Sequence, residues 1–476
     1  MSVSDTLENV FNPLNTYIWY IAFVFLIGLG IIFTLKLKGM QILKVDENAK
    51  LALANTEEGS KDEKKVSSFE AFCIGMGARI GVGNIAGVAT AIVTGGPGAV
   101  FWMWIFAIIG SASSFMESTV AQLYKKKKAD GGYHGGPAYY ATYGLGNKTL
   151  GIILAILIIV TFGIGFVGVQ ASNCSAALCE AFAFDNNQYV FGLIIAAGAA
   201  LIIFKGMKGI AKFSSKAVPI MALLWIIFAI IAICMNFTGV SNAVEMIFNC
   251  AFSPDALIGG GIGTVVLTGL KRGIFSNEAG LGSVANIAAT ANVKHPAKQG
   301  LIQSFGVLVD TLVVCSITAF VILSSGSFNE IMALGVRGAP LVQNVVASTA
   351  IGDAATYIIA LFMFIFAFTS LIGYYSMCES NMRFIKDDKK AINIVRLIVI
   401  VVAFASCLIT TALMDLISDT FMAAMGAVNI LVVGLLSKKA FALYRDYKDQ
   451  KKAGIEDPEF HKNDLFPDDN GVTEWD

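Results

Sequence analysis

Two stretches of the sequence place glycines, charges and amides together inside long apolar segments. The first, residues 77–84, reads GARIGVGN and lies within the apolar segment 69–94. Each glycine weakens a helix by about 1 kcal/mol relative to alanine, and Arg79 and Asn84 add a further cost in hydrocarbon. A membrane-crossing helix is expected to contain such a stretch where its backbone groups meet a ligand instead of lipid. We therefore predict a helix break at residues 77–84.

The second stretch, residues 271–282, interrupts the apolar segment 257–291 in the same way, with Lys271, Arg272, Asn277 and Glu278. Interrupted segments at matching positions of two inverted halves indicate a central binding site. The alternative is that the glycines only allow helices to pack closely. Packing alone does not require the clustered charges and amides, so the binding-site interpretation is favoured.

The expected breaks define the chemistry of a ligand. A half-helix that begins after the first break presents unpaired N–H groups at its positive end, which favour a carboxylate. Carbonyls freed on the other side suit a metal cation or an ammonium group. A small zwitterion together with a metal cation fits both ends, and the glycines leave little room for a larger molecule.

Polar side chains in two other apolar segments extend this hypothesis. Thr369 and Ser370 lie in segment 354–380, and Gln170 lies in segment 149–182, with Asn173 one turn further. Paired hydroxyls often only bond to the preceding helical turn, but opposite a broken helix they become ligands for a hard cation. A buried amide serves either as a contact between helices or as a ligand contact.

Three further charges, Glu117, Asp310 and Glu379, lie inside apolar segments and need partners or water. The sequence leaves two sets of ion pairs open: Arg79 with Asp310, or the pair Lys271 and Arg272 with Glu117 or Glu278. A proton relay through these carboxylates is an alternative to structural pairing.

The composition identifies an integral membrane protein of the helical kind. The chain has 476 residues, of which 56% are hydrophobic and 14% charged, whereas soluble domains carry about 25% charged residues. The 34 basic and 34 acidic residues cancel, so net charge indicates no nucleic-acid partner. Eight cysteines without CxxC spacing and three distant histidines indicate neither disulfides nor a metal centre of cysteine and histidine.

Hydropathy predicts eleven transmembrane spans, at residues 17–35, 69–94, 98–123, 149–182, 189–204, 215–236, 257–291, 300–324, 354–380, 392–413 and 419–441. With the N-terminus outside and the C-terminus cytoplasmic, thirty of the 34 basic residues fall in cytoplasmic segments, as the positive-inside rule requires. The lysine run 125–128 is then a topology signal. We expect residues 36–67 to form a polar linker and the charged tail, residues 447–476, to be mobile.

The run 95–105, GGPGAVFWMWI, closely resembles the signature of the sodium:alanine symporter family. GNIAGVATAI before it, KRGIFSNEAGLGS in segment 257–291 and HPAKQG after that segment are similar to the same family. The resemblance implies an all-α integral membrane protein with a leucine-transporter-like fold. Such a fold has an N-terminal extra helix and a 5+5 inverted repeat in which helices 1 and 6 are broken. The implied division is 1–66 for the extra helix and linker, 67–236 and 237–446 for the two repeats, and 447–476 for the tail.

The resemblance also implies roles for single residues. The amides of Val82 and Gly83, flanked by Gly81 and Asn84, would receive a substrate carboxylate. The substrate pocket would further contain Gln170, Asn277, Tyr374 and, as an apolar lid, Phe275. The carbonyls of Gly77, Ile80 and Phe366 with the hydroxyls of Thr369 and Ser370 would form a sodium site. Arg79 departs from the small or hydroxyl residue of many relatives, and a cation there would replace or repel a second sodium ion.

Together these features favour a sodium-coupled symporter of the cytoplasmic membrane that imports alanine or glycine by alternating access and is not an enzyme. The first alternative is a proton-coupled amino-acid transporter of the same fold that uses Glu117, Asp310 or Glu278. A channel or a membrane-embedded enzyme is the second alternative, but the sequence has neither repeated pore-lining segments nor a nucleophile or metal motif.

Overall fold

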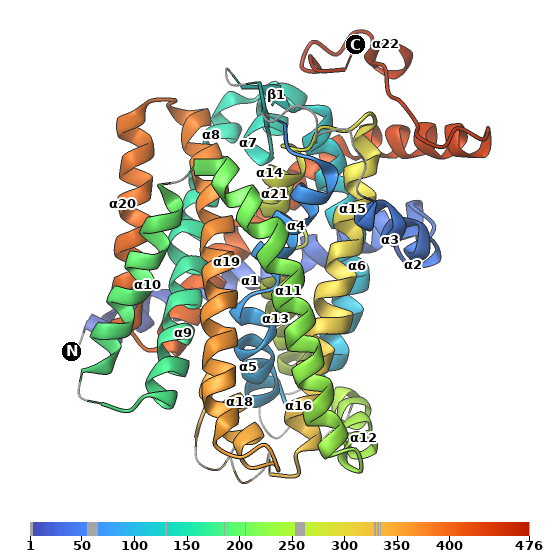
Figure 1. Cartoon of the computed structure of the whole chain (residues 1–476). Coiled ribbons are helices and arrows are strands. Elements are labelled where there is room, and N and C mark those ends of the chain that lie inside the picture. Colours follow the sequence, from blue (N-terminus) through green and yellow to red (C-terminus); the bar gives the residue numbers. More distant parts are fainter. Residues whose placement is uncertain are drawn as a thin grey trace.

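The computed structural model describes residues 3–54, 65–128, 131–184, 186–204, 206–252, 262–327, 330, 333 and 335–475. In this part of the chain, long helices run roughly side by side between an upper and a lower end (Figure 1). A short antiparallel hairpin of β1 (Lys126–Lys127) and β2 (Tyr133–His134) lies at the upper end, as do the last residues of the chain.

The long elements are α1 (Val3–Lys36), α6 (Gly98–Leu123), α8 (Lys148–Val160), α9 (Val167–Ala181), α10 (Asn187–Ile203), α11 (Gly206–Met235), α15 (Pro296–Leu308), α16 (Ser316–Ser324), α19 (Ala354–Ile385), α20 (Lys389–Ala405) and α21 (Thr411–Lys452). π-Helical segments join two pairs of these helices, η3 (Thr161–Phe166) between α8 and α9, and η5 (Val309–Cys315) between α15 and α16. Among the described residues, eight helices are long and apolar enough to cross a membrane. The chain is therefore a multi-pass helical membrane protein.

Both interruptions expected from the sequence are present. The first segment begins with α4 (Ser68–Arg79), passes through the 3₁₀ turn η1 (Val82–Asn84) and continues as α5 (Ala86–Gly95). In the second segment α13 (Ile262–Asn277) ends and, after five intervening residues, α14 (Ser283–Ala288) begins. The backbone of this second break has positive φ at Glu278, Gly280 and Gly282, a region that glycine adopts without strain. We call residues 77–84 the first break and residues 276–282, which include the last two residues of α13, the second break.

Shorter helices complete the fold: α2 (Met40–Leu43), α3 (Val45–Leu53), α7 (Pro137–Tyr139), α12 (Gly239–Phe252), α18 (Gly338–Ala347) and α22 (Lys462–Leu465), with the π-helical segment η2 (Tyr140–Gly144) and the 3₁₀ turn η6 (Ser406–Leu408). Helices α12 and α18 cover the lower end (Figure 1). The sequence analysis predicted neither of these two helices. The polar linker expected at residues 36–67 instead contains α2 and α3, whose Met40 and Ala52 are buried; its residues 55–64 lie outside the described part.

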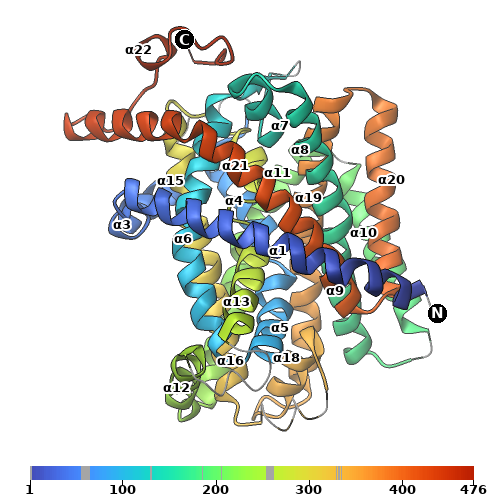
Figure 2. The same cartoon turned by 180° about the vertical axis from the view of Figure 1, so that it is seen from behind.

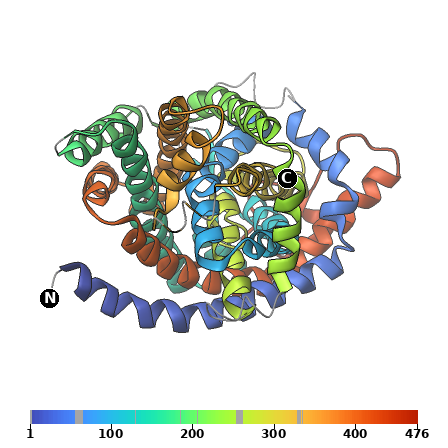
Figure 3. The same cartoon turned by 90° about the horizontal axis from the view of Figure 1, so that it is seen from below.

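Helix α1 lies obliquely across the outside of the bundle and crosses α21 (Figures 2 and 3). Two side-chain hydrogen bonds fasten it there, from Trp19 Nε1 to the Asp419 carbonyl at 3.1 Å and from Asn15 Nδ2 to Thr420 Oγ1 at 3.1 Å. Trp19 is fully buried, so this extra helix is an integral part of the fold.

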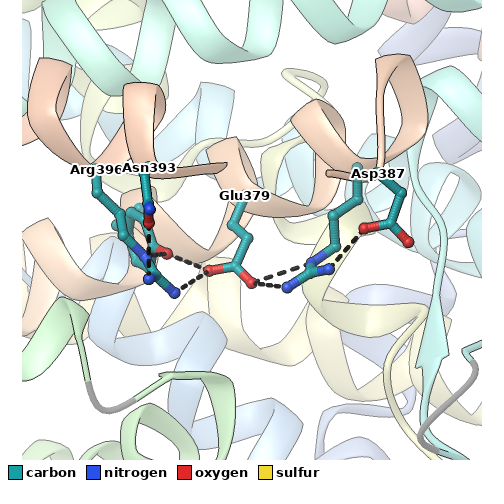
Figure 4. A network of polar contacts seen from close by, with 6 residues as sticks. Glu379, Asp387, Asn393 and Arg396 are labelled. Carbon is teal, nitrogen blue, oxygen red and sulfur yellow. Dashed lines mark hydrogen bonds and ion pairs between the residues drawn. The ribbon is translucent and has the colours of Figure 1, made fainter. Parts of the chain in front are cut away.

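A polar network joins α19 to α20 at the upper end (Figure 4). Glu379 accepts hydrogen bonds from Arg383 Nη2 at 2.7 Å and from the Tyr375 hydroxyl, and it lies 3.8 Å from Arg396. Arg383 also pairs with Asp387 at 2.7 Å. Glu379, which the sequence left without a partner, is therefore held between two arginines.

The C-terminal tail is docked, contrary to the expectation that it is mobile. Trp475 is 5% exposed and its Nε1 donates to the Gln122 carbonyl at 3.1 Å, while Lys125 Nζ lies 4.0 Å above its ring. Lys126 Nζ donates to the Gly471 carbonyl at 2.8 Å. The tail thus packs against the end of α6 and the hairpin. The Trp475 ring buries apolar surface there and also contacts the buried Lys125 ammonium group.

Replacing Trp475 with Ala should release this tail. Removing a buried tryptophan side chain costs about 3–5 kcal/mol of folding free energy. The remaining surface contacts of the tail do not compensate for a loss of this size. Limited trypsin digestion should cut the variant after Lys451 and Lys452 much faster than the wild type. The control is Ile455→Ala, which truncates an apolar side chain of the same tail that is 45% exposed. Equal cleavage of the wild type and the Trp475 variant would show that the tail is not held by this contact.

Candidate functional site

The freed backbone groups of the first break are paired with side chains from distant helices. The Val82 N–H donates to Gln170 Oε1 on α9 at 2.9 Å, and the Gly81 N–H donates to Asn84 Oδ1 at 2.8 Å. On α19, Ser370 Oγ donates to the Gly77 carbonyl at 3.0 Å and the Tyr374 hydroxyl donates to the Ala78 carbonyl at 2.9 Å. These side chains are buried. The structure therefore brings together Gly77, Gly81, Val82, Asn84, Gln170, Ser370 and Tyr374.

Aromatic rings cover this break from the side of α13. A Cβ placed on Gly83 would lie 3.1 Å from Phe275 Cδ1, so the ring rests against bare backbone. Phe275 stacks on Phe166 with ring centroids 4.6 Å apart, and Phe166 meets Tyr374 edge-on at 5.4 Å. Phe166 belongs to the π-helical segment η3 and was not found by sequence reasoning. Only glycine fits at residue 83 without moving this aromatic wall.

Oxygen atoms gather where α4 approaches α19. Thr369 Oγ1 donates to the Phe366 carbonyl at 3.0 Å, next to the contact between Ser370 and the Gly77 carbonyl. Ile80 follows at the end of α4, where its N–H donates to the Met76 carbonyl at 2.6 Å. The five residues expected to bind sodium thus lie on two adjoining helix segments. Hydroxyl and carbonyl oxygens are ligands that suit a hard cation.

The second break is held by a buried carboxylate. Glu117 of α6 accepts hydrogen bonds from the N–H groups of Gly282 at 2.8 Å and Gly280 at 3.3 Å. Asn429 of α21 donates to the Gly280 carbonyl at 2.8 Å and to Glu117 Oε2 at 3.0 Å. Glu117 therefore pairs with backbone N–H groups and not with Lys271 or Arg272, the partners that the sequence left open.

Arg79 also serves the backbone. Its Nε donates to the Asn277 carbonyl at 2.8 Å, its Nη1 to the Gln303 carbonyl at 3.0 Å, and its Nη2 to Ser114 Oγ at 2.9 Å. The suggested ion pair of Arg79 with Asp310 is not formed, because these three acceptors occupy the guanidinium. Arg79 ties the end of α13 to α6 and α15.

The two cations of α13 find partners on other helices. Arg272 pairs with Asp419 through a short hydrogen bond and lies 3.5 Å from Asp415, both of which are on α21. Lys271 Nζ donates to Asn15 Oδ1 of α1 at 2.8 Å. The suggested pairs with Glu117 or Glu278 are therefore replaced by contacts with α21 and α1.

Asp310 is the centre of a polar cluster that links both breaks. Asn84 Nδ2 donates to Asp310 Oδ1 at 2.6 Å, and Ser276 Oγ donates to Asp310 Oδ2 at 2.7 Å. Thr311 Oγ1 donates to the same carboxylate at 3.1 Å and accepts from Asn277 Nδ2 at 3.1 Å. Asp310 lies in the π-helical segment η5, a type of helix distortion that is frequent at functional sites. Sequence reasoning named Asp310 as a possible partner of Arg79 and as a candidate for proton coupling, but it missed Ser276 and Thr311.

A cavity of about 550 Å³ opens at the lower end and extends to Arg272 and Asp419. The Arg272 guanidinium, which lines this cavity, lies 5.5 Å from the centroid of the Phe275 ring, and Phe275 in turn lies against Gly83 of the first break. Towards the upper end, a pocket of only about 20 Å³ is lined by Asn286, Glu379 and other residues. The larger of these two hollows therefore lies at the lower end.

A bundle with two broken helices around a buried polar site is the architecture of a membrane transporter. A solved structure, that of MhsT in complex with L-phenylalanine, has this fold in common with the chain. The TM-score is 0.56 at 16% identity, over 78% of this chain and 89% of that chain; this similarity establishes the leucine-transporter-like fold alone.

The sequence comparisons give the family. Residues 4–462 match the sodium:alanine symporter family, and the chain belongs to that family. It is 43% identical to the probable sodium/glutamine symporter GlnT of Bacillus subtilis, over 99% of this chain and 97% of the relative. It is 42% identical to the amino-acid carrier protein AlsT of the same organism, over 96% and 97%. The family resemblance predicted from the sequence motifs is confirmed, and the chain is a cation-coupled amino-acid symporter.

Replacing Gly83 with Ala should lower the affinity for the amino-acid substrate, with alanine as the probe, by more than tenfold, because the added methyl group pushes against Phe275 and fills the space beside the first break. Alanine binding by calorimetry at fixed sodium, together with the melting temperature, measures this. The matched control is Gly87→Ala, one turn along, where the new Cβ would lie 3.9 Å from Phe275. Unchanged alanine affinity in a folded Gly83 variant would contradict the placement of a ligand at this backbone.

Proposed function

We propose that this protein imports alanine or glycine together with sodium ions, by alternating access of the central site to the two sides of the cytoplasmic membrane. The observation that carries the proposal is the first break, whose freed N–H and C=O groups lie beside the hydroxyls of α19. No water is available in a bilayer core to satisfy such groups. A site of this kind gives both a carboxylate and a cation better partners than lipid or solvent provides.

The substrate carboxylate binds the N–H groups of Val82 and Gly83 and displaces Gln170 Oε1 from Val82. Gln170 and Asn84 then line the carboxylate, and Phe275 and Tyr374 enclose the apolar side of the substrate, with Asn277 beyond them. The Phe275 ring lies 3.1 Å from where a Gly83 Cβ would be, which limits the substrate to a small side chain. This tight packing is the reason why we propose alanine or glycine as the substrate.

Sodium binds where α4 meets α19. On binding, the Thr369 and Ser370 hydroxyls turn from the carbonyls they now contact, and these carbonyls of Phe366 and Gly77 become ligands along with that of Ile80. The five oxygen atoms lie next to the substrate break, so ion binding orders the backbone that receives the carboxylate. This shared backbone couples the two ligands.

The topology supports import. We assign eleven spans in a 5+5 inverted repeat: α1, then α4–α5, α6, α8–α9, α10 and α11, then α13–α14, α15–α16, α19, α20 and α21. The division is 1–66, 67–236, 237–446 and 447–476, with the N-terminus outside and the C-terminus cytoplasmic. The upper end, which carries the lysines of β1 and of the end of α21, is then cytoplasmic. The cavity of about 550 Å³ faces outside, and Arg272, Asp419 and Phe275 form the outer closure.

Glutamine is a second candidate substrate, because the relative at 43% identity is named a probable sodium/glutamine symporter. A proton is the second candidate for the driving ion, since the Asp310 carboxylate lies between the two breaks and accepts hydrogen bonds from Asn84 and Ser276. Both candidates are outcomes of the same transport experiment.

Uptake by the purified protein in liposomes tests the proposal. An inward sodium gradient should drive accumulation of labelled alanine or glycine, and unlabelled glutamine should compete weakly. Replacing the gradient with potassium at constant pH should abolish accumulation. Accumulation driven by a pH gradient without sodium would establish proton coupling instead, and stronger uptake of glutamine than of alanine would overturn the assigned substrate.

Replacing Thr369 with Val tests the ion site within the same assay. The hydroxyl ligand is lost with little change in volume, so the sodium concentration for half-maximal uptake should rise about tenfold. The control is Thr318→Val, a buried threonine of α16 that bonds to its own helix at 3.2 Å. Unaltered sodium dependence in the Thr369 variant would remove this residue from the ion site.

A further inference from the structure

A concave basic surface lies where the end of α1 meets α21, away from the transport site. Its cations come from residues far apart in the sequence, and we call them the basic groove: Lys36, Lys38, Lys438, Arg445 and Lys448. These residues line a cavity of about 620 Å³, and all five side chains are exposed. A second cavity of about 350 Å³ beside it is shared by Lys38 and Lys448.

The groove is built from one face of each helix. Lys438, Arg445 and Lys448 are spaced seven and three residues apart along α21, so they project from the same side. Phe441 lies between them, and Lys36 Nζ is 5.4 Å from its ring centroid. The last part of α21 leaves the bundle sideways near α3 (Figure 2). It runs sideways relative to the long helices of the bundle (Figure 2).

The charge of the groove is not balanced from within. Among the residues that the structure describes, none of the five cations belongs to an ion pair. Asp449, the acid in the lining, lies 3.6 Å from Lys452, and Glu47 of the neighbouring cavity lies 3.0 Å from Lys44. Both of these acids therefore pair with lysines that do not belong to the basic groove.

Other lysines at the same end of the molecule have hydrogen-bond partners within the protein. Lys125 is buried and donates to Gln122 Oε1 at 3.0 Å, and burial lowers its pKa to about 7. Lys126 donates to the Gly471 carbonyl and to Thr473 Oγ1 at 3.0 Å. A general excess of positive charge on the cytoplasmic side explains lysines in loops. It does not explain why five cations that form no ion pair with the described residues line one hollow.

Exposed apolar side chains lie at the edge of the basic groove. Leu35 directly precedes Lys36 and is 70% exposed, and Leu435, which is also 70% exposed, lies one turn before Lys438. Both helices thus change from exposed leucine to exposed lysine at their entry to the groove. A ligand with an anionic head and apolar chains fits this surface, because its head can contact the lysines while its chains contact the leucines.

We propose that the basic groove binds the phosphate headgroup of an anionic phospholipid, whose acyl chains lie along Leu35 and Leu435. The lipid joins the extra helix α1 to α21 at the cytoplasmic surface. The recognised chemistry is a phosphodiester anion, which Lys and Arg contact through charge-assisted hydrogen bonds. The lipid, and not a free phosphate, is the ligand, because the exposed leucines continue the groove into the membrane.

Native mass spectrometry of the full-length protein in detergent tests the proposal with short-chain phosphatidylglycerol as the probe. The test variant combines Lys38→Gln, Arg445→Gln and Lys448→Gln. It should lower the affinity for phosphatidylglycerol by about 100-fold and leave the weak binding of phosphatidylcholine unchanged. The matched control combines Lys127→Gln, Lys389→Gln and Lys390→Gln, which removes the same charge from exposed sites at the same end. It should keep the affinity of the wild type.

Three results would overturn the proposal. An equal loss in both triple variants would mean that net charge alone attracts the lipid. Equal binding of phosphatidylcholine and phosphatidylglycerol by the wild type would show that no headgroup is recognised. Displacement of phosphatidylglycerol by millimolar glycerol 3-phosphate would make a soluble phosphate the ligand. All substituted residues are exposed, so the melting temperature without lipid should be unchanged. This measurement serves as the control that each variant is folded.

Discussion

The structure depends on one constraint, that backbone groups freed inside a membrane must find partners within the protein. Each broken helix exposes N–H and C=O groups, and the buried polar side chains of this chain are arranged around them. Gln170, Ser370 and Tyr374 serve the first break, and Glu117 serves the second. Polar residues that look isolated in the sequence thus compensate for the absence of regular helix.

This arrangement separates two kinds of partner. At the second break a carboxylate, an amide and an arginine hold the backbone, through hydrogen bonds of Glu117, Asn429 and Arg79. At the first break the partners are neutral amide and hydroxyl groups, which a carboxylate or a cation displaces more easily than it displaces a charged group. The first break is therefore suited to exchange its partners for ligands, while the second is suited to remain fixed. Asp310 connects them through Asn84 and Ser276.

The breaks could be predicted from the sequence because glycine, charge and amide residues are costly in a spanning helix for purely local reasons. Gln170 and Ser370 could be proposed as partners from their chemistry alone. The pairing of Arg272 with Asp415 and Asp419 could not, since it depends on how helices separated by more than 140 residues pack. The same holds for Phe166, which the π-helical segment η3 turns towards Phe275, and for the tail, which Trp475 fixes to the end of α6.

The central claim is that Gln170 occupies the place of the substrate carboxylate at the Val82 N–H. Melting temperatures of the wild type and of Gln170→Ala, each with and without saturating alanine and sodium, test it most directly. Without ligand, the variant should lose stability by about 1–3 kcal/mol, because a buried N–H group is left unpaired. With ligand, the difference should shrink, since the carboxylate takes that N–H in both proteins. The control Asn173→Ala removes an amide that bonds to its own helix at 3.1 Å and should show the same difference under both conditions. An equally large loss in the Gln170 variant with and without alanine would contradict the account and make Gln170 a contact between helices only.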